Sequence, residues 1–249
     1  MLTPLIAANW KMNKTVGESV QFAQQLAAEF AEFTEREIVI APSFTALYPV
    51  AQVLRESAIH LSAQNVHWSE KGAYTGEISA GMLIDIGCEY VIIGHSERRT
   101  LFGENDSDIN RKILTALTFD VTPIFCIGET LDERTAHKTF DVVSRQLKEG
   151  LNNIPSGDIR QLVIAYEPVW AIGTGKTATA EQAEEVHRHI RDLILASFGE
   201  DTANNVRIIY GGSVNQDNID GLMMQPNING ALVGGASLDV ESFRNIIKY

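Results

Sequence analysis

A carboxylate, an imidazole and an ammonium group each follow a short apolar run of this sequence. They belong to Glu167, His95 and Lys11. A general base, a proton donor and a fixed positive charge can together remove a proton beside a carbonyl group and stabilise the oxyanion that forms. We therefore predict an enzyme that acts on a small carbonyl compound, with Glu167 as its base.

Glu167 stands between Tyr166 and Pro168, and Trp170 comes shortly after it. For an arbitrary glutamate, helix capping or a surface position is the commoner role. Apolar neighbours desolvate a carboxylate, however, and burial raises the pKa of such a group toward the range useful for a general base. We expect this upward shift of the pKa at Glu167.

His95 comes directly after Ile92-Ile93-Gly94, and Ser96–Arg99 is predicted to be the first turn of a helix. A histidine in this setting is more often a core residue with satisfied hydrogen bonds than a catalyst. A helix N-terminus that faces the ring favours the neutral imidazole, which can donate a hydrogen bond to a carbonyl oxygen. We expect Glu97 and Arg98 to pair with each other, which is a structural role.

Lys11 follows Asn9 and Trp10. In most chains such a lysine is a solvated surface cation. At the end of a strand its charge can instead be fixed where an oxyanion develops. It also helps to attract an anion to a chain whose net charge is −12.

Eight short apolar runs alternate with longer segments of helical period. Each run is almost continuously apolar, which indicates parallel strands buried on both faces. Eight such units in 249 residues predict one α/β domain over residues 1–249, a (β/α)8 barrel with eight parallel strands, rather than an open doubly wound sheet. The predicted strands are Leu5–Ala8, Ile38–Ala41, Ile59–Ala63, Tyr90–Gly94, Pro123–Ile127, Leu162–Tyr166, Val206–Tyr210 and Gly230–Val233.

Two segments between the strands show a clear amphipathic pattern, and a last helix is expected at Val240–Tyr249. Ser19–Phe33 is predicted to bury one stripe, made of Val20, Ala23, Ala27 and Phe30. Ala180–Phe198 is predicted to bury another and to expose its His, Arg and Glu side chains; the stripe is Ala183, Val186, Ile190, Leu193 and Leu195.

Active sites of such barrels lie at the C-terminal ends of the strands. Lys11, His95 and Glu167 all follow predicted strands, so we expect them to meet on one rim. Gly211-Gly212 and Gly234-Gly235 follow the seventh and eighth strands. Glycine pairs often form no more than tight turns, but backbone N–H groups in these two loops commonly bind phosphate. The predicted substrate is therefore a phosphorylated carbonyl compound.

The segment Gly173–Ala178 loosely matches two nucleotide-binding patterns. A Walker A loop requires glycine where this chain has Trp170, and the dinucleotide motif follows its strand directly, whereas Glu167–Ile172 intervene here. We interpret Pro168–Ala178 instead as a mobile lid, with a stiff first hinge in which Trp170 is a packing anchor.

The composition is that of a globular protein, with 45% hydrophobic and 21% charged residues. The negative net charge argues against general nucleic-acid binding. Neither a signal peptide nor a membrane-spanning run is apparent, so we expect a cytoplasmic protein without a membrane partner. Cys88 and Cys126 could form one disulfide, but reduced cysteines are the better interpretation, and neither has metal-ligand spacing.

Five segments together resemble the triosephosphate isomerase family, and they run from the first strand to the eighth. They are Asn9–Asn13, Gly94–Arg99, Ala165–Gly175, Tyr210–Val214 and Gly234–Leu238. The resemblance implies the TIM-barrel fold and the reversible interconversion of dihydroxyacetone phosphate and D-glyceraldehyde 3-phosphate through an enediolate, in glycolysis and gluconeogenesis. It implies neither a metal nor an organic cofactor.

The resemblance also implies roles for individual residues. Glu167 moves a proton between two adjacent carbons, neutral His95 polarises the carbonyl group, Lys11 stabilises the enediolate, and Asn9 orients the substrate. The phosphate is held by backbone groups of Gly173, Ser213, Gly234 and Gly235. The family is itself a well-known example of lid closure; here Pro168–Ala178 would exclude water and hinder loss of phosphate, latched by Tyr210 and Ser213.

Members of this family are usually homodimers. The resemblance implies that the loop near Asn65–Glu77 reaches into a neighbouring subunit and places Thr75 beside its site. Two departures from the family pattern, Asp239 in place of a frequent lysine and Ile84 in place of a charged residue, lie outside the matched site groups.

Two other functions are compatible with parts of the sequence. A barrel aldolase or lyase would use Lys11 as a Schiff-base nucleophile beside the phosphate site. A nucleotide-binding module without catalytic activity would use Gly173–Ala178.

Overall fold

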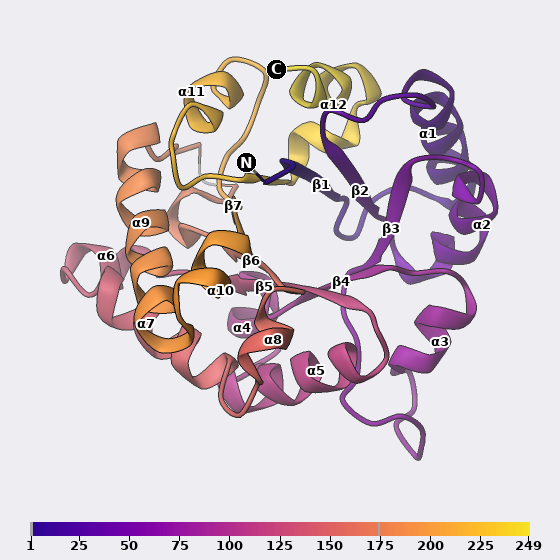
Figure 1. Cartoon of the computed structure of the whole chain (residues 1–249). Coiled ribbons are helices and arrows are strands. Elements are labelled where there is room, and N and C mark those ends of the chain that lie inside the picture. Colours follow the sequence, from indigo (N-terminus) through magenta and orange to yellow (C-terminus); the bar gives the residue numbers. More distant parts are fainter. Residues whose placement is uncertain (1, 174) are drawn as a thin grey trace.

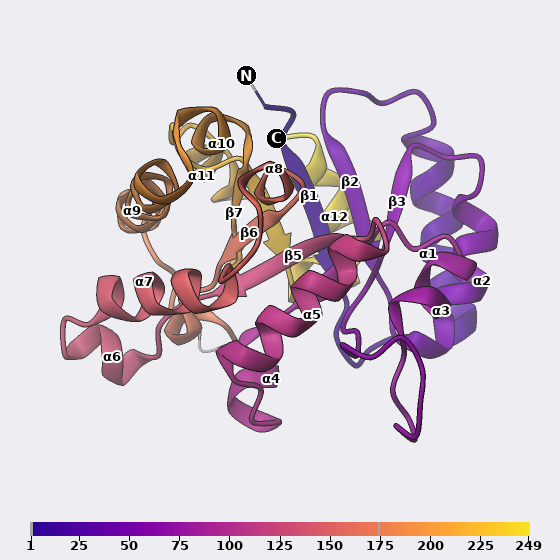
Figure 2. The same cartoon turned by 60° about the horizontal axis from the view of Figure 1, so that its bottom comes forward.

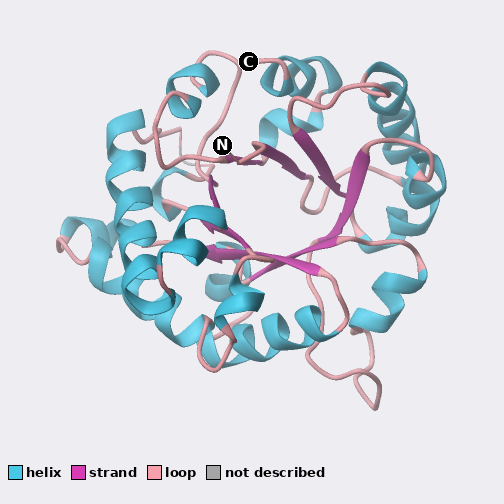
Figure 3. Cartoon of the chain, in the orientation of Figure 1, coloured by secondary structure: helices cyan, strands magenta, loops and turns pink. Residues whose placement is uncertain are grey.

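A computed structural model describes residues 2–173 and 175–249 of the chain. Eight parallel strands pair in the order β1 to β8 and close into a barrel, because β8 also pairs with β1 (Figures 1 and 3). The predicted eight-stranded barrel is confirmed, and each strand agrees with its predicted bounds to within one residue. The strands are β1 Leu5–Asn9, β2 Glu37–Ala41, β3 Ile59–Ala63, β4 Tyr90–Ile93, β5 Thr122–Ile127, β6 Val163–Tyr166, β7 Arg207–Tyr210 and β8 Gly230–Val233.

Helices surround the barrel and fill the segments between strands (Figure 3). The α-helices are α1 Val16–Glu29, α2 Phe44–Leu54, α3 Ala80–Asp85, α4 Ser96–Leu101, α5 Asp106–Thr118, α6 Leu131–Thr135, α7 Thr139–Gly150, α8 Ser156–Ile159, α9 Ala180–Phe198, α10 Glu200–Asn205, α11 Ile219–Met223 and α12 Val240–Ile247. Two short 3₁₀ helices are η1 Val169–Ala171 and η2 Gly235–Leu238.

The strands are apolar throughout because each packs on two layers. Alternate side chains point to opposite faces of a strand. One set, which includes Leu5, Val39, Ile92 and Val163, forms a cluster of its own inside the barrel. The other set, which includes Ile6, packs with the surrounding helices in the larger core. Cys88 and Cys126 are both buried and free.

Helix α1 begins earlier than predicted and buries a different stripe. Thr15 caps it in a capping box with Glu18, which fixes the start three residues ahead of the expected Ser19. Ser19, Phe22, Ala23, Leu26 and Phe30 are buried, whereas Val20 and Ala27 are only partly buried. The predicted stripe is right at Ala23 and Phe30, and Ala27 is partly buried and packs on the core, but Phe22 and Leu26 are buried where the prediction had Val20.

Helix α9 has the predicted bounds, but two of its side chains are not where the pattern placed them. Leu195 is 46% exposed and Ile194 takes the buried position beside it. His187, predicted to lie on the polar face, is fully buried. Within the part of the chain that the structure describes, no helix has both the length and the apolar character needed to cross a bilayer.

A polar cluster lies at the N-terminal ends of the strands, the end of the barrel away from the predicted site. Arg207 donates hydrogen bonds to Glu37 and to the Tyr90 hydroxyl. Nδ1 of His60 lies 2.7 Å from a carboxylate oxygen of Glu89, and Nε2 lies 3.8 Å from Glu37. The hydrogen bond and charge of Glu89 raise the pKa of His60, and burial opposes this rise only in part.

This contact predicts a pH-dependent contribution of His60 to stability. Because the pKa of His60 is raised on folding, its contribution is fully present below the ordinary value of about 6.5 and is lost as the pH rises through the folded value. Urea unfolding should show that His60→Gln lowers the free energy of unfolding more at about pH 5.5 than at about pH 8.5. An equal loss at both pH values would contradict this account.

Candidate active site

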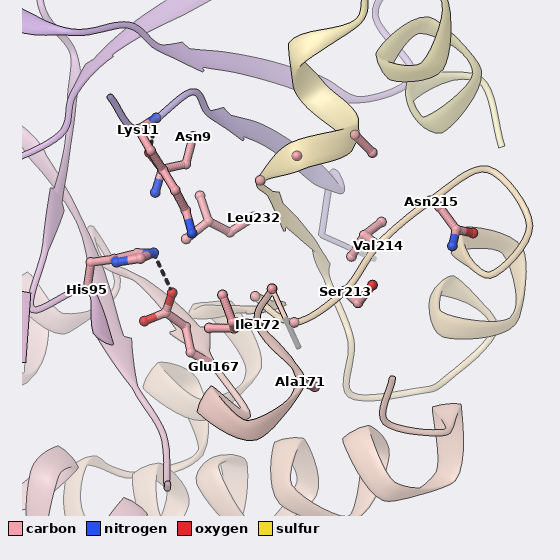
Figure 4. A pocket seen from close by; sticks show the side chains of 16 residues that line it. Asn9, Lys11, His95, Glu167, Ala171, Ile172, Ser213, Val214, Asn215 and Leu232 are labelled. Carbon is pink, nitrogen blue, oxygen red and sulfur yellow. Dashed lines mark hydrogen bonds and ion pairs between the residues drawn. The ribbon is translucent and has the colours of Figure 1, made fainter. Parts of the chain in front are cut away.

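The predicted site residues line one cavity of about 360 Å³ at the C-terminal ends of the strands (Figure 4). Lys11, His95 and Glu167 point toward a common space in Figure 4, and Ser213 lies across the cavity from them. Every residue predicted to bind or transform the substrate lines the cavity: Asn9, Lys11, His95, Glu167, Gly173, Ser213, Gly234 and Gly235.

Glu167 is only 1% exposed and accepts two hydrogen bonds at its carboxylate. Oε1 lies 2.9 Å from Nε2 of His95, and Oε2 accepts from the backbone N–H of Ser96 at 2.9 Å. Burial raises the pKa of Glu167, but the contacts with His95 and Ser96 and the charge of Lys11 together lower it by more. The expected upward shift of the pKa was therefore wrong, because the sequence does not reveal the His95 contact.

His95 caps helix α4, as the sequence indicated. Its Nδ1 accepts the backbone N–H of Glu97 at 3.2 Å, so the ring hydrogen lies on Nε2, facing Glu167. A second proton on the ring would break the bond to Glu97. Burial lowers the pKa of His95, whereas the charge and hydrogen bond of Glu167 raise it by more. The capping contact and the carboxylate thus favour opposite charge states of the ring.

Lys11 is fixed by backbone and side-chain contacts. Its N–H donates to Oδ1 of Asn9 at 3.1 Å, and its carbonyl accepts from Gln64 at 2.9 Å. Its ammonium group lies 2.6 Å from a carboxylate oxygen of Glu97. Glu97 thereby holds the lysine at the cavity, a role that the sequence analysis missed.

The predicted pair between Glu97 and Arg98 does not form. Glu97 binds Lys11, whereas Arg98 donates to Glu104 at 2.5 Å. Consecutive residues on a helix point in different directions, so neighbours in sequence rarely pair. Arg98 keeps the structural role expected of it, with a different partner.

Glycine is needed at the two pairs for different structural reasons. A Cβ atom at Gly211 would lie 2.9 Å from Cγ of Glu167, and one at Gly212 would lie 2.2 Å from the Tyr210 hydroxyl. The first pair therefore makes room for these side chains. A Cβ at Gly234 would meet only Lys11, at 3.7 Å, and one at Gly235 would meet nothing within 4 Å. The second pair leaves its backbone open to the cavity.

Pro168, the first residue of the predicted lid, is followed directly by the short helix η1. Gly173 and Gly175 have positive φ angles of 67° and 76°, which glycine adopts without strain. Thr174, which the predicted lid includes, lies outside the described residues. The other end of the lid is near Tyr210: the Ala178 backbone faces the buried hydroxyl without completing a hydrogen bond of standard geometry.

Glu129 is a buried carboxylate that fixes the first hinge of the lid. It has no exposed surface, and it accepts hydrogen bonds from the Tyr166 hydroxyl at 3.1 Å and from Nε1 of Trp170 at 2.9 Å. Arg134 lies 3.3 Å from it. No local sequence pattern reveals the partners of Glu129 in β6 and the lid.

The sequence model that describes triosephosphate isomerase matches residues 4–249. The chain belongs to the triosephosphate isomerase family. Curated relatives named triosephosphate isomerase match the whole chain. One from Geobacter metallireducens is 54% identical and one from Syntrophotalea carbinolica is 51% identical, each with 99% of its length covered. One from Chloroflexus aurantiacus is 50% identical over its full length.

These matches confirm the triosephosphate isomerase family, the fold and the enzyme class that were predicted from the sequence. The function is that of the family, the isomerisation of triose phosphates, and a role in glycolysis follows from the family name.

Proposed function

We propose that Glu167, His95 and Lys11 interconvert dihydroxyacetone phosphate and D-glyceraldehyde 3-phosphate in this cavity. The observation that carries the proposal is the division of the cavity into two parts. Acid, base and ammonium side chains meet on one side, and the open backbone of Gly234-Gly235 lies on the other. This arrangement fits a short molecule with a carbonyl group at one end and a phosphate at the other.

In the proposed reaction, the carboxylate of Glu167 takes a proton from the carbon beside the carbonyl group. Nε2–H of His95 donates to the carbonyl oxygen, and Lys11 stabilises the negative charge of the enediolate. Glu167 then returns the proton to the adjacent carbon, while His95 moves a proton between the two oxygens. Asn9 orients the substrate and fixes the Lys11 backbone.

The direct contact between Glu167 and His95 has to open for this reaction. Their 2.9 Å separation leaves no room for a substrate between them. When the substrate enters, the contact that lowers the pKa of Glu167 and raises that of His95 is removed. Glu167 then becomes a stronger base, and His95 is left as the neutral donor that its bond to Glu97 favours.

Backbone N–H groups of four residues are proposed to hold the phosphate. Such groups bind anions well, because they carry partial positive charge and lose little freedom on binding. The lid, closed by Tyr210 and Ser213, would keep water from the enediolate and hinder the loss of phosphate. The four residues are Gly173, Ser213, Gly234 and Gly235.

Gly173→Pro is expected to raise KM for the triose phosphate by roughly tenfold or more, the scale of one hydrogen bond to a charged group. Proline removes the donor and cannot adopt the φ of 67° found here. Gly173→Ala is also strained at this positive φ but retains the N–H, so it serves as the control. Steady-state kinetics would refute the contact if KM stayed unchanged in the proline variant.

We propose that residues 1–249 form one domain and that the enzyme works in the cytoplasm as a homodimer. The loop at residues 65–77 projects from the barrel (Figures 1 and 2), and its tip, including Thr75, is exposed. Large apolar side chains are also exposed on the segments that follow strands β1 to β4: Met12, Phe44, Tyr48, Tyr74, Met82, Leu101 and Phe102. Such a surface supports association with a second copy.

Met82→Asp is expected to shift the protein from dimer to monomer in sedimentation experiments, because a charge would enter an apolar interface. Leu195→Asp is the matched control. Leu195 is similarly exposed, 46% against 55%, but lies on α9 at the opposite side of the barrel (Figure 1). A dimer that survives Met82→Asp would argue against this surface.

A coupled assay of triose phosphate isomerisation on the purified protein tests the proposed function. The two alternative functions predict different experimental results. A Schiff-base enzyme would be labelled at Lys11 by borohydride in the presence of substrate, and a nucleotide-binding module would bind ATP or NAD in calorimetry and lack isomerase activity.

A further inference from the structure

His187 is a buried histidine that the proposed mechanism does not use. It lies on α9, the helix that begins directly after the predicted lid, and its side chain has no exposed surface. Burial lowers the pKa of the ring to about 3, so the ring stays neutral near neutral pH. Nδ1 lies 3.3 Å from the carbonyl oxygen of Asn227, which can only accept, so the ring hydrogen is on Nδ1.

The ring of His187 lies against two tyrosine rings. Its centroid is 5.8 Å from that of Tyr166, edge to face at 85°, and 6.4 Å from that of Tyr210, tilted by 38°. Among the described residues, Nε2 makes no hydrogen bond of standard geometry, although the backbone of Ile208 also faces the ring and, like that of Asn227, opposes the lowering of the pKa by burial. His187 therefore contacts both tyrosines through the ring itself, and its Nδ1–H also donates to the carbonyl oxygen of Asn227.

Each of these tyrosines contacts one end of the lid. The Tyr166 hydroxyl donates to Glu129, the carboxylate that also accepts Nε1–H of Trp170 at the first hinge. The Tyr210 hydroxyl faces the backbone of Ala178 at the other end. The ring of His187 thus connects two hinges that are separated by the length of the lid.

We propose that His187 is a positioning residue that couples the two hinges, so that both ends of the lid close together over the substrate. The inference rests on the proposed function, because it concerns closure over an enediolate. Without the ring, each tyrosine gains freedom and one end of the lid can open alone. The exposed enediolate then breaks its C–O bond to phosphate, releasing inorganic phosphate and leaving a three-carbon enol that rearranges to a dicarbonyl compound.

The test measures inorganic phosphate released for each triose phosphate isomerised. His187→Gln keeps a donor for Asn227 but removes the ring, and we expect it to raise this ratio by roughly tenfold, the scale of one aromatic pair. His187→Phe keeps the ring and should stay within about threefold of the unmodified protein. His189→Gln is the control: His189 is on the same helix, bonds Ser144 and stacks near Phe140, away from the lid.

A purely structural role would lower the thermal stability of His187→Gln without changing the ratio, and that result would overturn the proposal. So would an equal rise of the ratio in His187→Phe. The unmodified protein is measured in the same assay, and its failure to isomerise triose phosphate would refute the proposed function instead.

A double-mutant cycle gives a second test that needs no folded His187 variant. Tyr166→Phe and Tyr210→Phe each loosen one hinge. If the hinges are coupled, their effects on the phosphate ratio are not additive, because the first change already frees the second hinge. Additive effects would overturn the proposal.

Discussion

Glu167→Gln is expected to lower turnover by roughly 10⁴-fold, while KM for the triose phosphate changes little. Glutamine has almost the same shape and can still accept the hydrogen bond from the Ser96 backbone. It cannot take up a proton from carbon. Both proton transfers of the proposed reaction use this one carboxylate, so no other group of the cavity replaces it.

The measurement is the coupled isomerisation assay, with thermal unfolding as a check on folding. Glu185→Gln, an exposed position on α9, makes the same chemical change away from the cavity and should leave turnover intact. His95→Gln should also lose turnover, because it lacks the neutral ring that polarises the carbonyl group. Unchanged turnover in Glu167→Gln would show that the base is a different residue.

Gly128→Ala is expected to destabilise the protein by about 3 kcal/mol or more and to reduce activity strongly. A Cβ atom at this position would lie 1.7 Å from the backbone oxygen of Glu167 and 2.6 Å from its carbonyl carbon. Both atoms belong to backbone at the end of β6, so no side chain can rotate away. The strand end has to move, and it carries the proposed base with it.

Urea unfolding and steady-state kinetics of the same preparation check this expectation. Gly221→Ala is the control, because Gly221 lies in α11 and a Cβ there would meet nothing within 4 Å. That change should be neutral or stabilising, since alanine favours a helix by about 0.5–1 kcal/mol. Activity and stability equal to those of the unmodified protein in Gly128→Ala would refute the close approach.

Strand positions were predictable because burial on both faces leaves an unbroken apolar run, and Gly230–Val233 is an example. The rim position of Lys11, His95 and Glu167 followed from the architecture alone. Helix faces were less predictable: Val20 and Leu195 satisfy a helical period, yet the neighbours Phe22 and Ile194 pack better against the barrel.

Contacts between residues at the ends of different strands could not be predicted from the sequence. The pairing of Lys11 with Glu97 joins residues 86 positions apart, and that of Trp170 with Glu129 joins residues 41 apart. The same holds for the pKa of Glu167, which depends on a contact with His95. Composition near a residue indicates burial, but it does not identify the charge that a folded chain brings opposite it.

The pairing of β8 with β1 has a consequence for how this enzyme comes into being. During synthesis the first seven strands leave the ribosome with two unpaired edges, which are prone to associate with other chains. Both edges disappear when Gly230–Val233 pairs with β7 on one side and with Leu5–Ala8 on the other. The next residues, Gly234-Gly235, supply the open backbone proposed to bind phosphate. The step that removes both exposed edges therefore also brings the backbone proposed to bind phosphate beside Lys11.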